Sequence, residues 1–253
     1  MTNKLKYFVG NWKMFGSFSS LKNIYRIHRF CVKFNKARKK NKIILCVPNT
    51  LIYFFTKKFR SKIISIGAQN CHHHQTEGSF TGSVNAKMLK NVGANYIILG
   101  HSESRHEGDT NQLIKKKIKS ALNQQLYVIF CIGETYSEKI RKKTFSVLKN
   151  QLKSSMDKKI NLNNVIIAYE PVWSIGTGKI PKIDSLRNIF RFIKNEFKKN
   201  FKTKTSPPVL YGGSVNDKNI TKFTSILEID GFLIGGASRS SKKFIDIIKN
   251  YYK

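Results

Sequence analysis

The chain has 253 residues, 40% of them hydrophobic, and a formal net charge of +33. The length exceeds that of most single domains but matches the roughly 250 residues of a closed α/β barrel. No apolar segment approaches the roughly 20 residues of a membrane span, so we expect no membrane partner. The lysines are spread over almost every expected helix, so the charge by itself does not indicate a nucleic-acid-binding protein.

Eight short apolar runs alternate along the chain with stretches of helical period. The predicted strands are residues 7–9, 43–47, 63–68, 96–99, 126–132, 165–169, 209–211 and 231–234. The predicted helices are residues 20–34, 50–59, 85–92, 111–123, 137–156, 183–199, 217–224 and 242–251. Eight such units predict a single (β/α)8 TIM barrel, with residues 1–253 as one catalytic domain; a doubly wound open sheet is the weaker alternative.

Polar side chains follow several of the predicted strands, at the barrel end where such folds carry their chemistry. Asn11 and Lys13 follow the first strand, His101 the fourth and Glu170 the sixth. Each alone has an ordinary explanation, as a surface lysine, a loop histidine or a solvated strand-end acid. Together, Glu170 as a base and His101 as a proton donor form a pair suited to moving hydrogen between adjacent carbons.

Residues 171–179 directly follow Glu170, and we expect them to form a lid. Pro171 stops the strand, an apolar stretch forms a stiff front, and Gly176 and Gly178 provide a flexible rear. A lid over a carboxylate would control the access of water to a base.

Two glycine pairs follow the last two predicted strands. Gly212 and Gly213 come after the seventh, and Gly235 and Gly236 after the eighth. Bare backbone N–H groups and a helix amino terminus can converge there on an anion, and barrels commonly bind phosphate at this place. Each pair alone is weak, because tight turns use glycine anyway. The two together predict a phosphate site.

No metal site or disulfide is expected. Consecutive side chains in a loop should diverge, so we do not expect His72, His73 and His74 to bind one metal ion together. No second ligand set with a recognised spacing lies nearby to complete a site. The four cysteines show no metal or disulfide spacing, which fits a cytoplasmic location.

Several segments carry a resemblance to a known family. They are GNWKM at 10–14, GAQN at 67–70, FTG at 80–82, ILGHSE at 98–103, CIGET at 131–135, AYEPVWSIGTGK at 168–179, YGGS at 211–214 and DGFLIGGAS at 230–238. In this order and spacing the chain resembles the triosephosphate isomerases along essentially its whole length. The resemblance implies a cofactor-free enzyme of glycolysis and gluconeogenesis. Its reaction would interconvert dihydroxyacetone phosphate and D-glyceraldehyde 3-phosphate through an enediolate.

The resemblance also implies a role for each catalytic residue. Glu170 would be the base that removes a carbon-bound proton and returns it to the adjacent carbon. His101 would be a neutral imidazole that polarises the carbonyl, and a helix amino terminus there would disfavour its cationic form. Lys13 and Asn11 would stabilise the oxyanion and the phosphate, with Glu103 orienting Lys13.

The phosphate site and the lid are assigned by the same resemblance. Four backbone N–H groups would bind the phosphate, those of Gly176, Ser214, Gly235 and Gly236. Closure of the lid would press Ile175 and Leu233 around Glu170 and raise its basicity by desolvation.

A few positions depart from the family pattern. Ser104 stands where the family commonly has an arginine, and Ser174 replaces an alanine in the lid. The loop at 71–77 is one residue longer than usual, and Ser79 and Ser83 replace a common alanine and a common acid. In the family this region docks into a partner subunit, so the resemblance implies a homodimer and the changes bear on its details.

Two alternatives compete with this interpretation. Another phosphate-binding barrel isomerase would not explain the lid motif together with Gly-His-Ser-Glu. A basic nucleic-acid-binding or structural protein that has lost catalysis would have broken site residues, whereas Asn11, Lys13, His101 and Glu170 are all present. It would also concentrate its basic surface among aromatic residues, which the dispersed lysines do not.

Overall fold

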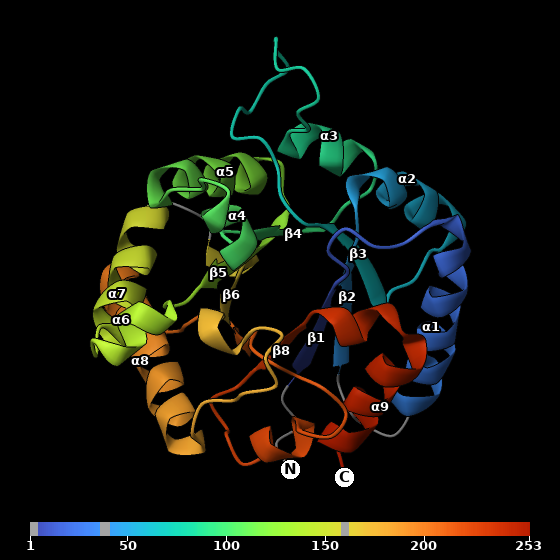
Figure 1. Cartoon of the computed structure of the whole chain (residues 1–253). Helices are drawn as coiled ribbons and strands as arrows, with labels where there is room; N and C mark the ends of the chain where they lie inside the picture. Colours follow the sequence, from blue (N-terminus) through green and yellow to red (C-terminus); the bar gives the residue numbers. More distant parts are fainter. Residues whose placement is uncertain (1–4, 36–40, 158–161) are drawn as a thin grey trace.

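The computed structural model describes residues 5–35, 41–157 and 162–253. Eight parallel strands form a closed barrel in chain order, and the last strand pairs with the first. Helices surround the barrel as an outer ring (Figure 1). The prediction of a (β/α)8 barrel is confirmed, and closure of the sheet excludes the doubly wound alternative.

The strands lie close to the predicted runs. They are β1 (Lys6–Asn11), β2 (Asn41–Cys46), β3 (Ile64–Ala68), β4 (Tyr96–Leu99), β5 (Tyr127–Ile132), β6 (Val165–Tyr169), β7 (Val209–Tyr211) and β8 (Gly231–Ile234). Their side chains alternate between the barrel interior and the helical ring. Val9 and Ile44, for example, face the interior, whereas their neighbours Phe8 and Ile43 pack in the layer between strands and helices. Both faces of the sheet are therefore buried, which explains the continuous apolar runs.

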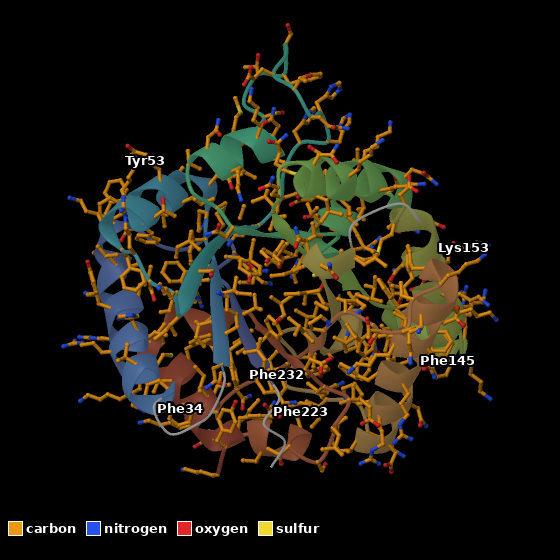
Figure 2. All side chains as sticks on the ribbon, turned by 180° about the vertical axis from the view of Figure 1, so that it is seen from behind. Phe34, Tyr53, Phe145, Lys153, Phe223 and Phe232 are labelled. Carbon is orange, nitrogen blue, oxygen red and sulfur yellow. The ribbon has the colours of Figure 1, made fainter. Side chains whose placement is uncertain are left out.

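The helices account for most of the predicted helical stretches. They are α1 (Leu21–Asn35), α2 (Asn49–Lys58), α3 (Ala86–Asn91), α4 (Ser102–His106), α5 (Asn111–Asn123), α6 (Tyr136–Ile140), α7 (Thr144–Ser155), α8 (Ile183–Phe201) and α9 (Ser241–Tyr251). Their apolar faces pack inwards, and most of their lysines are exposed, although Lys117 of α5 is buried. Lys153 of α7 lies on the periphery, whereas Phe232 of β8 is buried in the layer between strands and helices (Figure 2). Within the described residues, no helix combines the length and the apolar character that crossing a bilayer requires.

Two predicted helices were wrong. The stretch 137–156 is split into α6 and α7, because Lys142 adopts a left-handed backbone with φ of +57° that a continuous helix does not allow. The stretch 217–224 forms only a four-residue 3-10 helix, Ile220–Phe223. There the Asn216 side chain accepts the N–H groups of Lys218 and Asn219, both at 2.9 Å, and these local bonds compete with an α-helical turn.

The segment between β3 and α3 extends beyond the helical ring (Figure 1). The rings of His72, His73 and His74 do not diverge as expected but contact one another, with centroids 4.4 to 5.2 Å apart, and His74 also contacts Phe80. The described part of the chain holds no group of three His, Cys, Asp or Glu residues arranged for a metal ion.

Candidate active site

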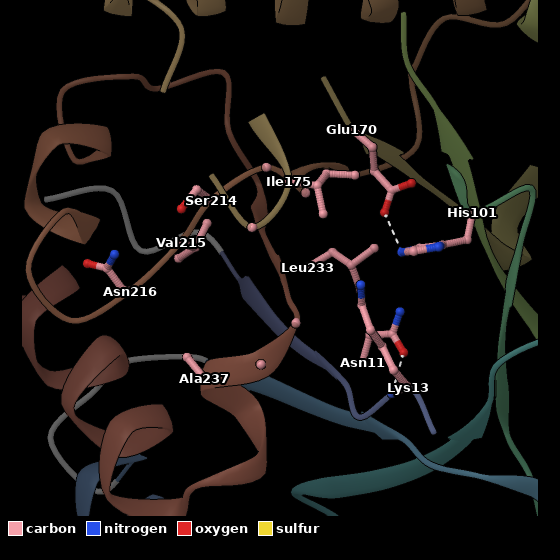
Figure 3. Close-up of a pocket in the computed structure, with 15 residues that line it drawn as sticks. Asn11, Lys13, His101, Glu170, Ile175, Ser214, Val215, Asn216, Leu233 and Ala237 are labelled. Carbon is pink, nitrogen blue, oxygen red and sulfur yellow. Dashed lines mark hydrogen bonds and ion pairs between the residues drawn. The ribbon is translucent and has the colours of Figure 1, made fainter. Parts of the chain in front are cut away.

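A cavity of about 260 Å³ lies at the carboxyl ends of the strands. It is lined by Asn11, Lys13, His101, Glu170, Ile175, Gly176, Gly212, Gly213, Ser214, Val215, Asn216, Leu233, Gly235, Gly236 and Ala237. Every residue predicted for the site is therefore in its lining except Glu103, which contacts Lys13 from beside it. Glu170 and His101 lie on one side, and Ser214 and Val215 on the other (Figure 3).

Glu170 is held at the end of β6 by its two neighbouring strands. Its N–H donates to the Ile132 carbonyl of β5 at 2.8 Å, and its side chain is buried, with the residue only 2% exposed. A Cβ on Gly133 would lie 1.7 Å from the Glu170 carbonyl oxygen, and one on Gly212 would lie 2.8 Å from its Cγ. Only glycine fits at these two positions: at Gly133 it allows the backbone of Glu170 to approach, and at Gly212 it leaves room for the Glu170 side chain.

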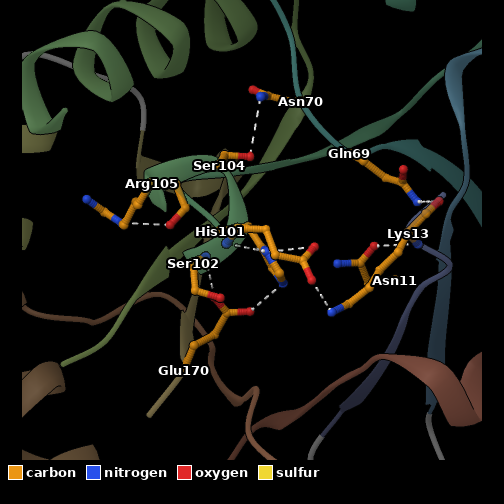
Figure 4. A network of polar contacts seen from close by, with 11 residues as sticks. Asn11, Lys13, Gln69, Asn70, His101, Ser102, Ser104, Arg105 and Glu170 are labelled. Carbon is orange, nitrogen blue, oxygen red and sulfur yellow. Dashed lines mark hydrogen bonds and ion pairs between the residues drawn. The ribbon is translucent and has the colours of Figure 1, made fainter. Parts of the chain in front are cut away.

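Both oxygens of the Glu170 carboxylate have polar partners (Figure 4). Oε1 lies 3.2 Å from His101 Nε2, and Oε2 accepts the Ser102 N–H at 3.2 Å. Burial raises the pKa of Glu170, and His101, the Ser102 amide, Cys131 and Lys13 partly oppose this rise. A raised pKa makes the carboxylate a stronger base than an exposed one.

His101 caps the amino terminus of α4, which is absent from the helical stretches predicted by periodicity, although the family resemblance implied a helix start there. Its Nδ1 accepts the Glu103 N–H at 3.2 Å and therefore carries no proton in this arrangement. The ring is then neutral, with its proton on Nε2, which faces Glu170. This geometry agrees with the expectation of a neutral imidazole at a helix start.

Lys13 has a left-handed backbone, with φ of +55°, and two side chains hold it there. Asn11 Oδ1 accepts the Lys13 N–H at 3.0 Å, and Gln69 Nε2 donates to the Lys13 carbonyl at 2.9 Å. The ammonium group forms an ion pair with Glu103. The Lys13 backbone is thus held by groups from β1 and from the end of β3 (Figure 4), and its ammonium by Glu103 of α4.

The opposite end of the cavity is built from the two glycine turns. Residues 212–214, which we name the phosphate turn after the phosphate site predicted from the sequence, follow β7. Gly235 precedes a short 3-10 helix, Gly236–Arg239, after β8. A Cβ on Gly213 would lie 2.3 Å from the Tyr211 hydroxyl, so this turn also requires glycine. Backbone N–H groups in such turns and at helix starts bind anions.

The family model described as triosephosphate isomerase matches residues 6–251. The chain belongs to the triosephosphate isomerase family. It is 38% identical to a triosephosphate isomerase of Dictyoglomus thermophilum over 250 residues, which cover 97% of this chain and 99% of that protein. It is also 38% identical to one from Zygosaccharomyces bailii, with 96% and 98% covered. The crystal structure of triosephosphate isomerase from Bartonella henselae superposes with a TM-score of 0.87 at 32% identity, covering 98% of this chain and 99% of that chain.

The predicted lid, residues 171–179, is anchored at its front and exposed at its rear. The Trp173 indole N–H donates to Glu134 Oε1 at 2.9 Å, and the Lys139 ammonium lies 3.1 Å from the Trp173 ring centroid. Gly176 and Gly178 have φ of +72° and +77°, a conformation that glycine adopts without strain. The front is therefore held by side-chain contacts, and the glycines lie in the rear as predicted.

The departures from the triosephosphate isomerase pattern have local partners. Ser104 accepts a hydrogen bond from the Asn70 side chain at 3.4 Å. The neighbouring Arg105 donates to the Gly100 carbonyl at 2.8 Å and to the Cys131 carbonyl at 3.1 Å, so one arginine supports the turn before His101. Ser174 is fully buried and contacts the phosphate turn.

Sequence reasoning missed several residues around this site. They are Gln69 and Ser102, which hold Lys13 and Glu170, Glu134 under the lid, and Val215, Asn216 and Ala237 in the cavity lining. Gln69, Ser102 and Glu134 lie within the family segments, so their position in those motifs was the available signal. Their roles depend on contacts across the barrel, which spacing along the chain does not show.

Proposed function

We propose that this cavity interconverts dihydroxyacetone phosphate and D-glyceraldehyde 3-phosphate through an enediolate. One observation carries the proposal: a buried carboxylate lies 3.2 Å from the Nε2 of a neutral imidazole, in the same cavity as two glycine turns that can bind phosphate. Residues 1–253 would act as one catalytic domain.

The first step is removal of a carbon-bound proton. The phosphate binds to the N–H groups of Gly176, Ser214, Gly235 and Gly236, which places the other end of the substrate beside Glu170. The Glu170 carboxylate takes a proton from carbon 1 of dihydroxyacetone phosphate. The electron pair of that bond forms the double bond between carbons 1 and 2, and the π pair of the carbonyl moves onto its oxygen.

Three polar side chains stabilise the resulting enediolate. The Lys13 ammonium and the Asn11 amide lie in the cavity wall, and the His101 Nε2–H faces the reacting end. Fixed donors of this kind stabilise charge that develops in the transition state without reorganising. Glu103 positions Lys13 through their ion pair.

The second step completes the isomerisation. His101 gives its Nε2 proton to the oxygen on carbon 2 and takes one from the oxygen on carbon 1, so the imidazole ends as it began. Glu170 returns its proton to carbon 2, and the aldehyde forms at carbon 1. The carboxylate is then free for another turnover.

Exclusion of water strengthens the base and protects the intermediate. Ile175 and Leu233 both line the cavity (Figure 3), and closure of the lid brings apolar surface around Glu170. Desolvation of this kind raises the basicity of a carboxylate. It also keeps the enediolate from losing its phosphate.

The test is a coupled assay of D-glyceraldehyde 3-phosphate formation. Glu170→Gln removes the base, and kcat should fall by about 10²- to 10⁴-fold, the range that general base catalysis contributes. Glu170→Asp keeps a carboxylate but withdraws it by one methylene, and should lose less. Unchanged turnover in both variants would remove Glu170 from its role.

We also propose a homodimer in the cytoplasm. The exposed side chains of Met14, Phe15 and Phe18 lie next to Lys13 in the chain, and Phe80 is exposed on the protruding segment at 71–83. Contact between these surfaces of two copies would cover both. The four cysteines are buried and unpaired, which suits a reducing compartment.

Sedimentation measures the oligomeric state directly. Phe80→Glu places a charge in the proposed interface and should shift the protein towards monomer, with reduced activity. Leu227→Glu is the matched control, because Leu227 is 69% exposed at the opposite end of the barrel. A native protein that is monomeric and fully active would contradict the dimer.

A further inference from the structure

The Ser174 side chain lies at a junction of three segments and is fully buried. Its hydroxyl donates to the Lys179 carbonyl at 2.6 Å, at the far end of the lid. Its oxygen accepts the Ser214 N–H of the phosphate turn at 3.3 Å and lies 3.2 Å from the Tyr211 hydroxyl. A hydroxyl has one proton and two lone pairs, so Tyr211 is the donor in the last contact and Ser174 has no bonding capacity left.

The junction is closely packed. A Cβ on Gly213 would lie 2.8 Å from Ser174 Oγ and 2.3 Å from the Tyr211 hydroxyl, so the backbone of the phosphate turn passes directly against both groups. The front of the lid, the rear of the lid and the phosphate turn are therefore linked through one oxygen atom. The alanine that the family pattern has at this position could make none of these bonds.

The Ser214 amide is the part of the junction that a ligand would change. It lines the cavity, but its N–H is directed to Ser174. The bond is longer than the usual 2.9–3.0 Å for an N–H donor, and a phosphate oxygen carries charge and is a stronger acceptor than a hydroxyl. A phosphate group that enters the cavity can therefore take this N–H from Ser174.

We propose that the Ser174 hydroxyl accepts the hydrogen bond from the Ser214 N–H until substrate binds, and that a phosphate oxygen of the substrate then replaces it as the acceptor. Ser174 is then a positioning residue, which touches no reacting atom and acts through Ser214 and the lid. After displacement it keeps its bonds to Lys179 and Tyr211, so the two ends of the lid stay tied together while the lid closes. The inference rests on the proposed function, because it takes the Ser214 amide as a phosphate ligand.

Ser174→Ala removes the competitor and should tighten phosphate binding. The dissociation constant of inorganic phosphate, measured by calorimetry, and the KM for D-glyceraldehyde 3-phosphate should both fall about two- to tenfold, the effect of one neutral hydrogen bond. The kcat/KM for D-glyceraldehyde, which has no phosphate, should not change. A merely structural role would alter both substrates alike.

Tyr211→Phe is the matched control. It removes a hydrogen bond from the same oxygen but leaves the contact between Ser174 and Ser214, so it should not tighten phosphate binding. Ser174→Cys provides a second variant that retains a side chain of similar size, and its weaker acceptor should give an intermediate gain.

Two failures are distinguishable. If the native protein shows no isomerase activity, the proposed function itself is wrong. If the native protein is active but Ser174→Ala binds inorganic phosphate with equal or lower affinity, Ser174 and phosphate do not compete for the Ser214 N–H. Ser174 then has only a structural role.

Discussion

Glu170 illustrates how opposing local effects set the strength of one base. Burial raises the pKa of its carboxyl group, whereas His101, the Ser102 amide and Lys13 favour the charged form. Burial is the largest of these effects, so the carboxylate is held in a position that suits the proposed proton abstraction but is unfavourable for its charge. Active sites commonly sacrifice stability in this way.

This conflict predicts a gain of stability when the charge is removed. Because the pKa of Glu170 is raised in the folded state, protonation of Glu170 stabilises the fold. This stabilisation is complete below the unfolded-state pKa of about 4.3 and is lost as pH rises through the folded-state pKa. Glu170→Gln does not titrate, and it should be more stable than the native protein by about 1–2 kcal/mol at pH 7.

Urea denaturation between pH 4 and pH 8 measures this difference. The gap between the two proteins should widen as pH rises from about 4. A variant that is less stable than the native protein at pH 7 would show that the contacts with His101 and Ser102 outweigh the cost of burial.

The elements of the barrel determine how closely the site residues approach one another. β5, β6 and β7 are neighbours in the sheet, so Gly133 and Gly212 meet Glu170 at the strand ends. The register of parallel strands depends on the whole sheet, and no local pattern reveals which glycine faces which side chain. The same limit explains the split of the helix predicted at 137–156, since helical period continues through a turn that the backbone of Lys142 interrupts.

Gly212→Ala tests this arrangement. Its Cβ would lie 2.8 Å from Glu170 Cγ and should push the carboxylate out of place. A misplacement of about 1 Å can cost on the order of 10²-fold in rate, so kcat should fall by at least about tenfold.

Gly93→Ala is the control for backbone strain. Gly93 has φ of +98° and a Cβ there would lie 2.7 Å from Thr56 Oγ1, on the outer side of the barrel before β4. It should lower the melting temperature and leave kcat unchanged. If Gly212→Ala retains full activity, the contact with Glu170 is not what requires glycine there.

The charge of the whole molecule acts on the encounter with substrate rather than on the chemistry. A net charge of +33 surrounds a cavity whose substrate is an anion. Fields of this kind raise association rates, and salt screens them beyond a Debye length of about 10 Å at 0.1 M. The lysines are dispersed, so the effect is long-range attraction without a specific binding face.

Salt should therefore slow the capture of the phosphorylated substrate. Between 10 and 200 mM ionic strength we expect kcat/KM for D-glyceraldehyde 3-phosphate to fall by about tenfold, with kcat little changed. D-glyceraldehyde is uncharged and serves as the control. Stopped-flow or steady-state rates that do not depend on ionic strength would show that the charge does not steer the substrate.

The sequence by itself determined the order of the eight strands, most of the helices, the family and most of the residues that line the cavity. Apolar runs bounded by turns are local features, and motifs such as those around His101 and Glu170 keep their spacing in the chain. Only the tertiary structure decided that the Ser102 N–H donates to the Glu170 carboxylate, that Gln69 donates to the Lys13 backbone carbonyl, and that the Ser174 hydroxyl accepts the Ser214 N–H. These partners are separated by 68, 56 and 40 positions in the chain, and closure of the barrel is what brings them within hydrogen-bonding distance.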